Sequence, residues 1–187
     1  SMSGLAMLFS GAAAFADDPA VSGAIVVGND FRDWITPVLD SVANYNTLGT
    51  SVAQRLASNG VSLAAVALLP ESEWINNLRG ALVDTNNPIR LSYPAYPFVF
   101  DFPLARWQGI TADDAAAVDA FAAWLLAQHP ENYGLRPADG IVPETARLFT
   151  EAENYGVQPE VDLMQTVTLP ARAETQRVQV WLGTIVR

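Results

Sequence analysis

The 187-residue sequence contains no cysteine and no lysine, and only one histidine, His129. Without cysteine, the chain has no thiol nucleophile, disulfide or Cys-ligated zinc site. Without lysine, it has neither a Schiff-base lysine nor the lysine of a phosphate-binding P-loop. The hydrolase pattern G-x-S-x-G and the metalloprotease pattern H-E-x-x-H are missing as well. We therefore expect a protein that is not an enzyme and that uses no metal and no cofactor.

Positive charge is scarce, because 20 acidic residues outweigh 10 basic ones and leave a formal net charge of −10. Such a surface repels nucleic-acid phosphates and anionic lipids, so we expect no nucleic-acid partner and no direct membrane insertion. Half of the residues are hydrophobic, which is typical of a folded protein. No internal repeat, low-complexity tract or linker divides the sequence. We predict one domain over residues 1–187.

A short apolar run from Leu5 to Ala16 has two interpretations. It ends in Ala14-Phe15-Ala16, which mimics the cleavage site of a signal peptide, but no basic residue precedes it. The alternative is a helix that Ser3 caps and that Asp17-Asp18-Pro19 ends. The run is too short to span a bilayer. We favour the helix.

Apolar residues at helical spacing predict further helices over residues 31–45, 113–128 and 173–185, and shorter ones that begin at Thr50 and at Pro70-Glu71. The helix over 113–128 has the clearest pattern, and its stripe consists of Ala117, Phe121, Trp124, Leu125 and Gln128. Because such a stripe usually packs on a core, we predict that Phe121, Trp124 and Leu125 are buried.

Three segments have the character of strands. Residues 63–69 (LAAVALL) form a continuous apolar run between turn signals, as expected for a strand covered on both faces. Residues 89–93 and 96–102 are predicted as further strands, with Pro94 and Pro97 marking edges or a bend. We predict that 63–69 and 96–102 lie in the interior of one sheet, flanked by helices near 5–16, 31–44 and 111–128. The pattern indicates an α/β fold.

The segment from Tyr93 to Pro137 resembles the late part of bacterial extracellular solute-binding proteins with the type II periplasmic-binding fold. An apolar strand is followed there by a turn, an amphipathic helix and a YGFRPA-like motif, which residues 133–138 (Tyr-Gly-Leu-Arg-Pro-Ala) match. Ser3-Gly4 match the Ser-Gly pair that opens the second lobe of that family. Residues 44–51 match its Ser- and Thr-containing turn, without the histidine. Leu69-Pro70-Glu71-Ser72 match the end of its next strand, without the aromatic residue.

This resemblance implies a three-layer α/β/α lobe with a mixed sheet and flanking helices. The family places most of its first lobe before the Ser-Gly helix, so the chain is expected to be the second lobe and the C-terminal return segment. Either it is a piece of a longer protein or a partner supplies the rest. The group that it resembles most is found beside von Willebrand A modules, which implies a bacterial surface or extracellular location and such a module, or the missing lobe, as a partner.

The ligand-binding residues that this comparison implies are Ser3, Gly4, Tyr45, Asn46, Thr47 and Glu71. A helix N-terminus at Ser3-Gly4 binds small anions, or Ser3 is a plain cap. The turn at 45–47 offers hydroxyl and amide groups to a ligand, or is an ordinary turn. Glu71 accepts hydrogen bonds from a ligand, or stabilises the start of the following helix.

Two functions follow. The first is a ligand-binding lobe that takes up or senses a small-molecule or anionic solute, without catalysis. The alternative is a structural or protein-interaction domain that has lost the ligand pocket. The missing histidine and aromatic residue favour the alternative, whereas Ser-Gly, the Thr-containing turn and Glu71 favour the first.

Overall fold

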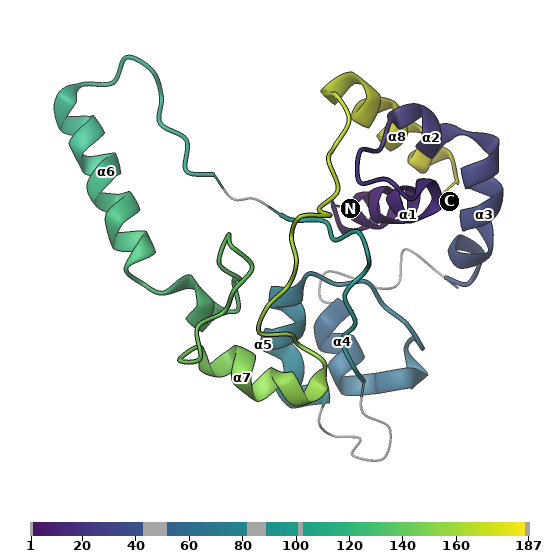
Figure 1. Ribbon diagram of the computed structural model, residues 1–187, viewed down its shortest axis with the longest axis horizontal. Coiled ribbons are helices and arrows are strands. Elements are labelled where there is room, and N and C mark those ends of the chain that lie inside the picture. The colour runs from purple at the N-terminus through teal and green to yellow at the C-terminus, as the bar shows by residue number, and fades with distance from the viewer. Residues whose placement is uncertain (1, 43–51, 82–88, 101–102, 186–187) are drawn as a thin grey trace.

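The computed structural model describes residues 2–42, 52–81, 89–100 and 103–185. These residues form eight α-helices and three short 3₁₀ helices, joined by irregular segments (Figure 1). The elements are α1 (Met2–Ala16), α2 (Gly23–Val27), α3 (Asn29–Asp40), α4 (Val52–Asn59), η1 (Gly60–Ser62), α5 (Glu71–Ala81), α6 (Ala112–Leu126), η2 (Pro130–Tyr133), α7 (Arg147–Ala152), η3 (Glu153–Tyr155) and α8 (Arg172–Ile185).

The predicted α/β fold with a mixed sheet is wrong. In the described ranges, β-pairing is limited to two isolated bridges, one between Ala20 and Thr168 and one between Ile141 and Glu160. The helices, in contrast, lie close to their predicted positions: α1, α3, α4, α5, α6 and α8 each overlap a helix expected from the sequence. The error therefore concerns the strands and the architecture built on them.

The segment 63–69 is a connection between two helices and not an interior strand. Helices α4 and α5 pack against each other, and this segment links the end of one to the start of the other (Figure 1). Val66 is 89% exposed and Leu68 is 47% exposed. A strand requires a neighbour to pair with its backbone, and the described part of the chain provides none here. The apolar composition alone therefore did not make a strand.

The segments 89–93 and 96–102 are not strands either, as far as they are described; residues 101–102 lie outside the described ranges. Tyr96 is buried, and its hydroxyl donates a hydrogen bond of 2.7 Å to the Asp17 carboxylate at the end of α1. Phe98 packs on the same core, but Val99 is 45% exposed. The side chains are thus anchored singly to a helical core, without a ladder of backbone hydrogen bonds.

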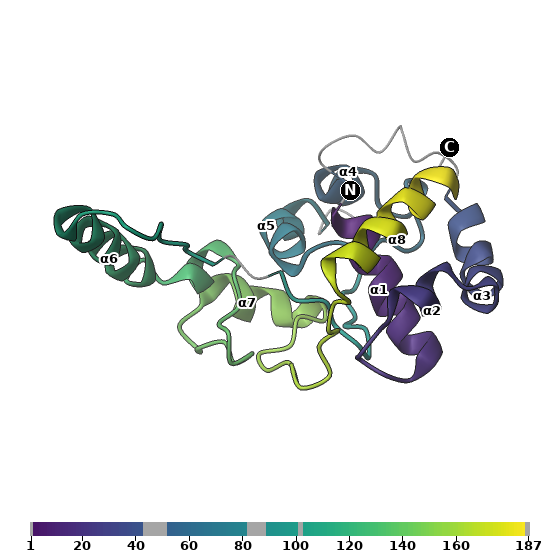
Figure 2. The same ribbon diagram turned by 90° about the horizontal axis from the view of Figure 1, so that it is seen from above.

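One hydrophobic cluster joins α1, α2, α3 and α8, which lie together on one side of the molecule (Figures 1 and 2). From α1 it takes Leu5, Leu8, Phe9, Ala12 and Ala13, which follow helical spacing. Gly23 allows α2 to approach α8 closely, because a Cβ atom at this position would lie 2.7 Å from the Cβ of Glu174. The helix expected at 5–16 is confirmed, and it forms the centre of this cluster.

A second cluster joins α4, α5 and α7. Its buried side chains are Leu56, Trp74, Ile75, Val142, Ala146, Phe149, Ala152 and Val157. Helix α7 lies inside residues 134–170, for which the sequence pattern predicted no helix. Two clusters are compatible with one domain or with two, so the single domain over 1–187 stays a prediction.

Helix α6 stands apart from both clusters in two perpendicular views (Figures 1 and 2). None of its 15 residues is buried. The prediction that Phe121, Trp124 and Leu125 are buried is wrong, because they are 49%, 56% and 43% exposed. The spacing of large apolar residues shows which of them share a face of a helix, but it does not show whether a surface of the same chain covers that face.

Candidate functional site

The predicted ligand-binding residues do not form one described site. Tyr45, Asn46 and Thr47 lie outside the described residues. Ser3 and Gly4 lie inside the first turn of α1, which begins at Met2, so Ser3 is not the residue that precedes the helix. Glu71 is the first residue of α5. Helix α1 packs in the first hydrophobic cluster and α5 in the second, and hence Gly4 and Glu71 are not brought together by a shared core.

Glu71 instead forms an ion pair with Arg136. The Nε atom of Arg136 donates to Oε2 of Glu71 at 3.0 Å, and Nη2 donates to Oε1 at 2.6 Å. The hydroxyl of Tyr93 also donates to Oε1. The Arg136 and Glu71 side chains are only 10% and 19% exposed. Both carboxylate oxygens therefore have donors from the chain itself, and the pair has the two-pronged geometry that favours strong hydrogen bonds.

The other N–H groups of the Arg136 guanidinium donate to backbone carbonyls. Nη1 donates to the carbonyl oxygens of Gly140 and Pro159, at 2.8 and 3.1 Å, and Nη2 donates to that of Gln158 at 2.6 Å. The guanidinium carbon also lies 5.3 Å from the centre of the Phe149 ring. A guanidinium has five N–H groups, and these contacts together with Glu71 use all of them. Arg136 thus has no donor left for a solute.

The surroundings raise the pKa values of both Tyr93 and Arg136. Burial, assisted by the hydrogen bond to Glu71 and by its charge, raises the pKa of Tyr93 above its ordinary value. Burial lowers the pKa of Arg136, but the hydrogen bond and charge of Glu71 outweigh this effect and raise it overall. Tyr93 therefore stays a hydroxyl donor and Arg136 stays a cation at neutral pH.

We call Glu71, Tyr93 and Arg136 the buried ion cluster. It joins the start of α5 to three segments far along the chain, around residues 93, 136–140 and 158–159. This arrangement explains the position of Glu71 better than a solute does, because every strong contact of its carboxylate is internal. Neither of the two roles expected for Glu71 had included Arg136 as its partner.

Sequence reasoning missed Arg136 and Tyr93 as partners of Glu71. Arg136 lies within the Tyr133–Ala138 motif, and Tyr93 opens the segment on which the resemblance rests. The sequence offers 20 acidic residues as partners, and only the packing of α5 selects Glu71.

The exposed surface of α6 is the second candidate site. Asp114, Ala117, Phe121, Trp124 and Gln128 follow one another at intervals of three, four, three and four residues, the last in the turn after the helix. This spacing places all five on one face, and we call them the α6 stripe. The rings of Phe121 and Trp124 stack on this face with centroids 5.9 Å apart.

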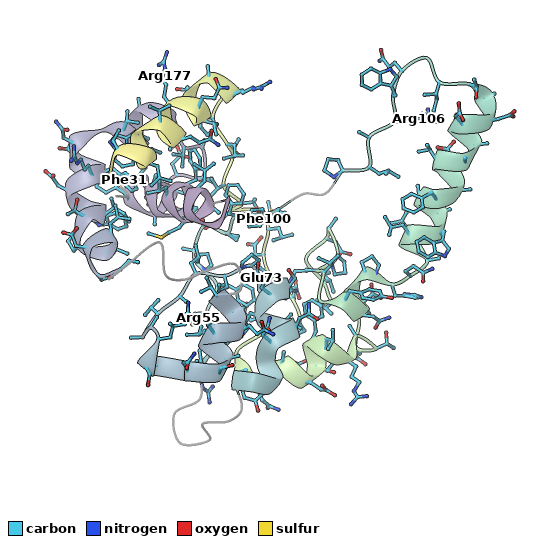
Figure 3. All side chains as sticks on the ribbon, turned by 180° about the vertical axis from the view of Figure 1, so that it is seen from behind. Phe31, Arg55, Glu73, Phe100, Arg106 and Arg177 are labelled. Carbon is cyan, nitrogen blue, oxygen red and sulfur yellow. The ribbon has the colours of Figure 1, made fainter. Side chains whose placement is uncertain are left out.

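One side-chain contact between α6 and another segment lies on the face opposite the stripe. Arg106, which Figure 3 labels on the segment that leads into α6, forms an ion pair with Asp119 at 3.3 Å. Asp119 lies two residues before Phe121, which is about 160° around the helix axis. The Asp119 side chain is itself 70% exposed, so this pair covers little of the helix. On the stripe, Phe121 and Trp124 are 49% and 56% exposed. Thr111 caps the N-terminus by accepting a hydrogen bond from the Asp114 N–H at 3.2 Å.

Other features of the described residues carry less chemistry. An open depression on α8 is lined by Ala173, Gln176, Arg177, Val180, Trp181 and Thr184. Within the described ranges, no three His, Cys, Asp or Glu side chains are placed to hold a metal ion. The His129 ring lies beside Glu131, with 3.1 Å between Nδ1 and Oε1. No helix of the described part is long and apolar enough to cross a membrane.

Comparisons with known proteins give no match: no family model fits the sequence, and searches of curated proteins and of solved structures find no significant relative.

Proposed function

We propose that this chain is a non-catalytic protein-interaction domain and that α6 is its binding element. The observation that supports this proposal is that α6 presents two stacked aromatic side chains on a helix with no buried residue. Large apolar side chains grouped on an exposed surface are typical of sites that bind another protein.

The stability of α6 supports the same proposal. With 15 residues, α6 is close to the length of about 12–15 residues below which an isolated helix is only marginally stable in water. Within the described chain its stabilisation comes from the Thr111 cap, the early acidic residues and the Arg106–Asp119 pair. A partner surface that buried Phe121 and Trp124 would supply the missing apolar contacts. Recognition of a helix by a groove or by another helix works through anchors at this spacing.

A protein surface fits α6 better than a lipid or a nucleic acid does. Asp113, Asp114 and Asp119 make the helix acidic, and the whole chain has a net charge of −10. These charges oppose binding to phosphates and to anionic membranes. The solute-binding function implied by the family resemblance stays a prediction, and no described residue of the buried ion cluster offers it a ligand contact.

Site-specific photo-cross-linking in the native host tests this proposal. A photoreactive residue replaces Leu125, which flanks the stripe, or Leu126, which is 74% exposed and lies about 140° from Phe121 around the helix. We expect discrete cross-linked proteins from position 125 and much weaker ones from position 126. If neither position gives a discrete product, or both give the same diffuse products, α6 is not a binding element.

A further inference from the structure

We propose that the partner of α6 is a second copy of this chain, and that the two α6 helices pair in antiparallel orientation about a two-fold axis at Phe121. This inference rests on the proposed function, because it names the partner of the same helix. The spacing of the α6 stripe supports it: intervals of three and four residues are those of two helices that pack along a shared seam.

Antiparallel pairing matches the residues of the stripe by size and polarity. When Phe121 faces Phe121 of the second copy, Ala117 faces Trp124 on both sides of the axis. Asp114 faces Gln128 at both ends. A small side chain is thus opposite the largest one. The Asp114 carboxylate, which accepts a hydrogen bond from the Thr111 hydroxyl, is opposite the Gln128 amide, which donates one N–H to the Trp124 carbonyl and has a second N–H to donate. Residues flanking the seam also match, since Val118 faces Leu125.

Parallel pairing would give the opposite result. Asp114 would face Asp114, Trp124 would face Trp124, and Ala117 would face Ala117, so that the seam would contain like charges, a crowded layer and a gap. The acidic residues of α6 also lie in its first half, at Asp113, Asp114 and Asp119, and residues 120–128 carry no charge. The antiparallel arrangement keeps the acidic halves apart and pairs each helix N-terminus with a C-terminus.

The close approach that such a seam needs is available. Ala120 and Ala127 flank the stripe on the side opposite Val118 and Leu125, and small residues there let two helix backbones come near each other. Leu126 and Asp119 point away from the seam. A contact of about two heptads buries less area than a standard stable interface, so we expect a dimer that dissociates on dilution.

Sedimentation equilibrium of the full chain, from low-micromolar to millimolar concentration, tests the pairing. We expect a monomer–dimer equilibrium for the unchanged chain. Trp124→Ala and Ala117→Trp should each raise the dissociation constant by about tenfold or more, whereas Leu126→Ala should leave it unchanged. The double variant A117W/W124A keeps one large and one small residue in each layer, and it should restore dimerisation relative to both single variants.

The rescue by the double variant separates pairing from folding, because a variant that merely unfolded α6 would not recover on a second change. Failure of the double variant to dimerise better than either single variant would overturn the proposed layers. An unchanged chain that is monomeric at every concentration would overturn the inference as a whole. Photo-cross-linking from position 125 to a different protein would then leave the proposed function standing without self-pairing.

Orientation is tested by cross-linking, for which the absence of native cysteine is an advantage. Asp114→Cys and Gln128→Cys variants are treated with a short bis-maleimide, separately and as a mixture. Antiparallel pairing predicts a cross-linked dimer mainly in the mixture, with one copy of each variant. Efficient cross-linking of the Asp114→Cys variant alone would indicate parallel helices and contradict the proposal.

Discussion

The guanidinium of Arg136 forms a two-pronged ion pair with the carboxylate of Glu71, 65 residues earlier in the chain. Through this pair, the first residue of α5 is connected to the backbone around residues 140 and 158–159. The contact therefore links segments that share no regular secondary structure with each other. The ion pair and these carbonyl contacts hold the irregular segments around residues 140 and 158–159 next to the start of α5, beside the second hydrophobic cluster.

Removal of the Glu71 charge is expected to destabilise the chain strongly. Glu71→Gln leaves the largely buried Arg136 without a counter-charge, and we expect a loss of about 3 kcal/mol in the free energy of unfolding, measured by urea denaturation. The matched control is Glu151→Gln, which removes an exposed pair with Arg147 and should cost less than about 0.5 kcal/mol. Equal losses in the two variants would show that the buried ion cluster is not structural.

Stability at alkaline pH should depend on Tyr93. Because the pKa of Tyr93 is raised above 10.0 in the folded chain, the folded state holds its proton to higher pH than the unfolded state does. Its contribution to stability is complete below pH 10 and is lost as the pH rises further. Urea denaturation at several pH values should show a steeper loss above pH 10 for the unchanged chain than for Tyr93→Phe.

The corresponding control is Tyr133→Phe, which removes the hydroxyl of a tyrosine that is 62% exposed. This variant should follow the unchanged chain across the whole alkaline range. If Tyr93→Phe and Tyr133→Phe give the same slope, burial of Tyr93 is not the cause of the alkaline loss.

Truncation of two large aromatic residues should have very different effects. Phe149 is 1% exposed in the second hydrophobic cluster, and Phe149→Ala should cost about 3–5 kcal/mol. Trp124 is 56% exposed, and Trp124→Ala should cost less than about 1 kcal/mol at concentrations where the chain is monomeric. Thermal or urea denaturation of both variants provides the comparison. A loss above 3 kcal/mol for Trp124→Ala in the monomer would mean that α6 packs on the body of the chain.

Small solutes should bind weakly or not at all to this chain. Isothermal titration with oxyanions, sugars and amino acids is expected to give no submicromolar affinity, because the carboxylate of Glu71 already accepts hydrogen bonds from Arg136 and Tyr93. Submicromolar binding would contradict this expectation and would favour the solute-binding function implied by the resemblance.

The positions of six helices (α1, α3, α4, α5, α6 and α8) followed from the sequence, since their apolar residues recur at helical spacing, whereas α2 and α7 were not predicted. The end of α1 at Asp17-Asp18-Pro19 was predicted in this way, and Thr111, directly before Ala112, caps α6. These are local properties, which depend on residues within one or two turns of each other. The same holds for the acidic charge and for the absence of cysteine chemistry.

Three features could not be predicted in this way, because each depends on residues far apart in the chain. They are whether the apolar segments pair as strands, which residue contacts Glu71, and whether α6 is buried. The apolar run at 63–69 is suited to a strand, yet a strand needs a neighbour, and the packing of α4 on α5 made it a connection. The stripe of α6 is suited to a core, yet no described surface of the chain covers it. Composition and periodicity establish what a segment is able to bury, whereas long-range packing establishes whether it is buried, and against which residues.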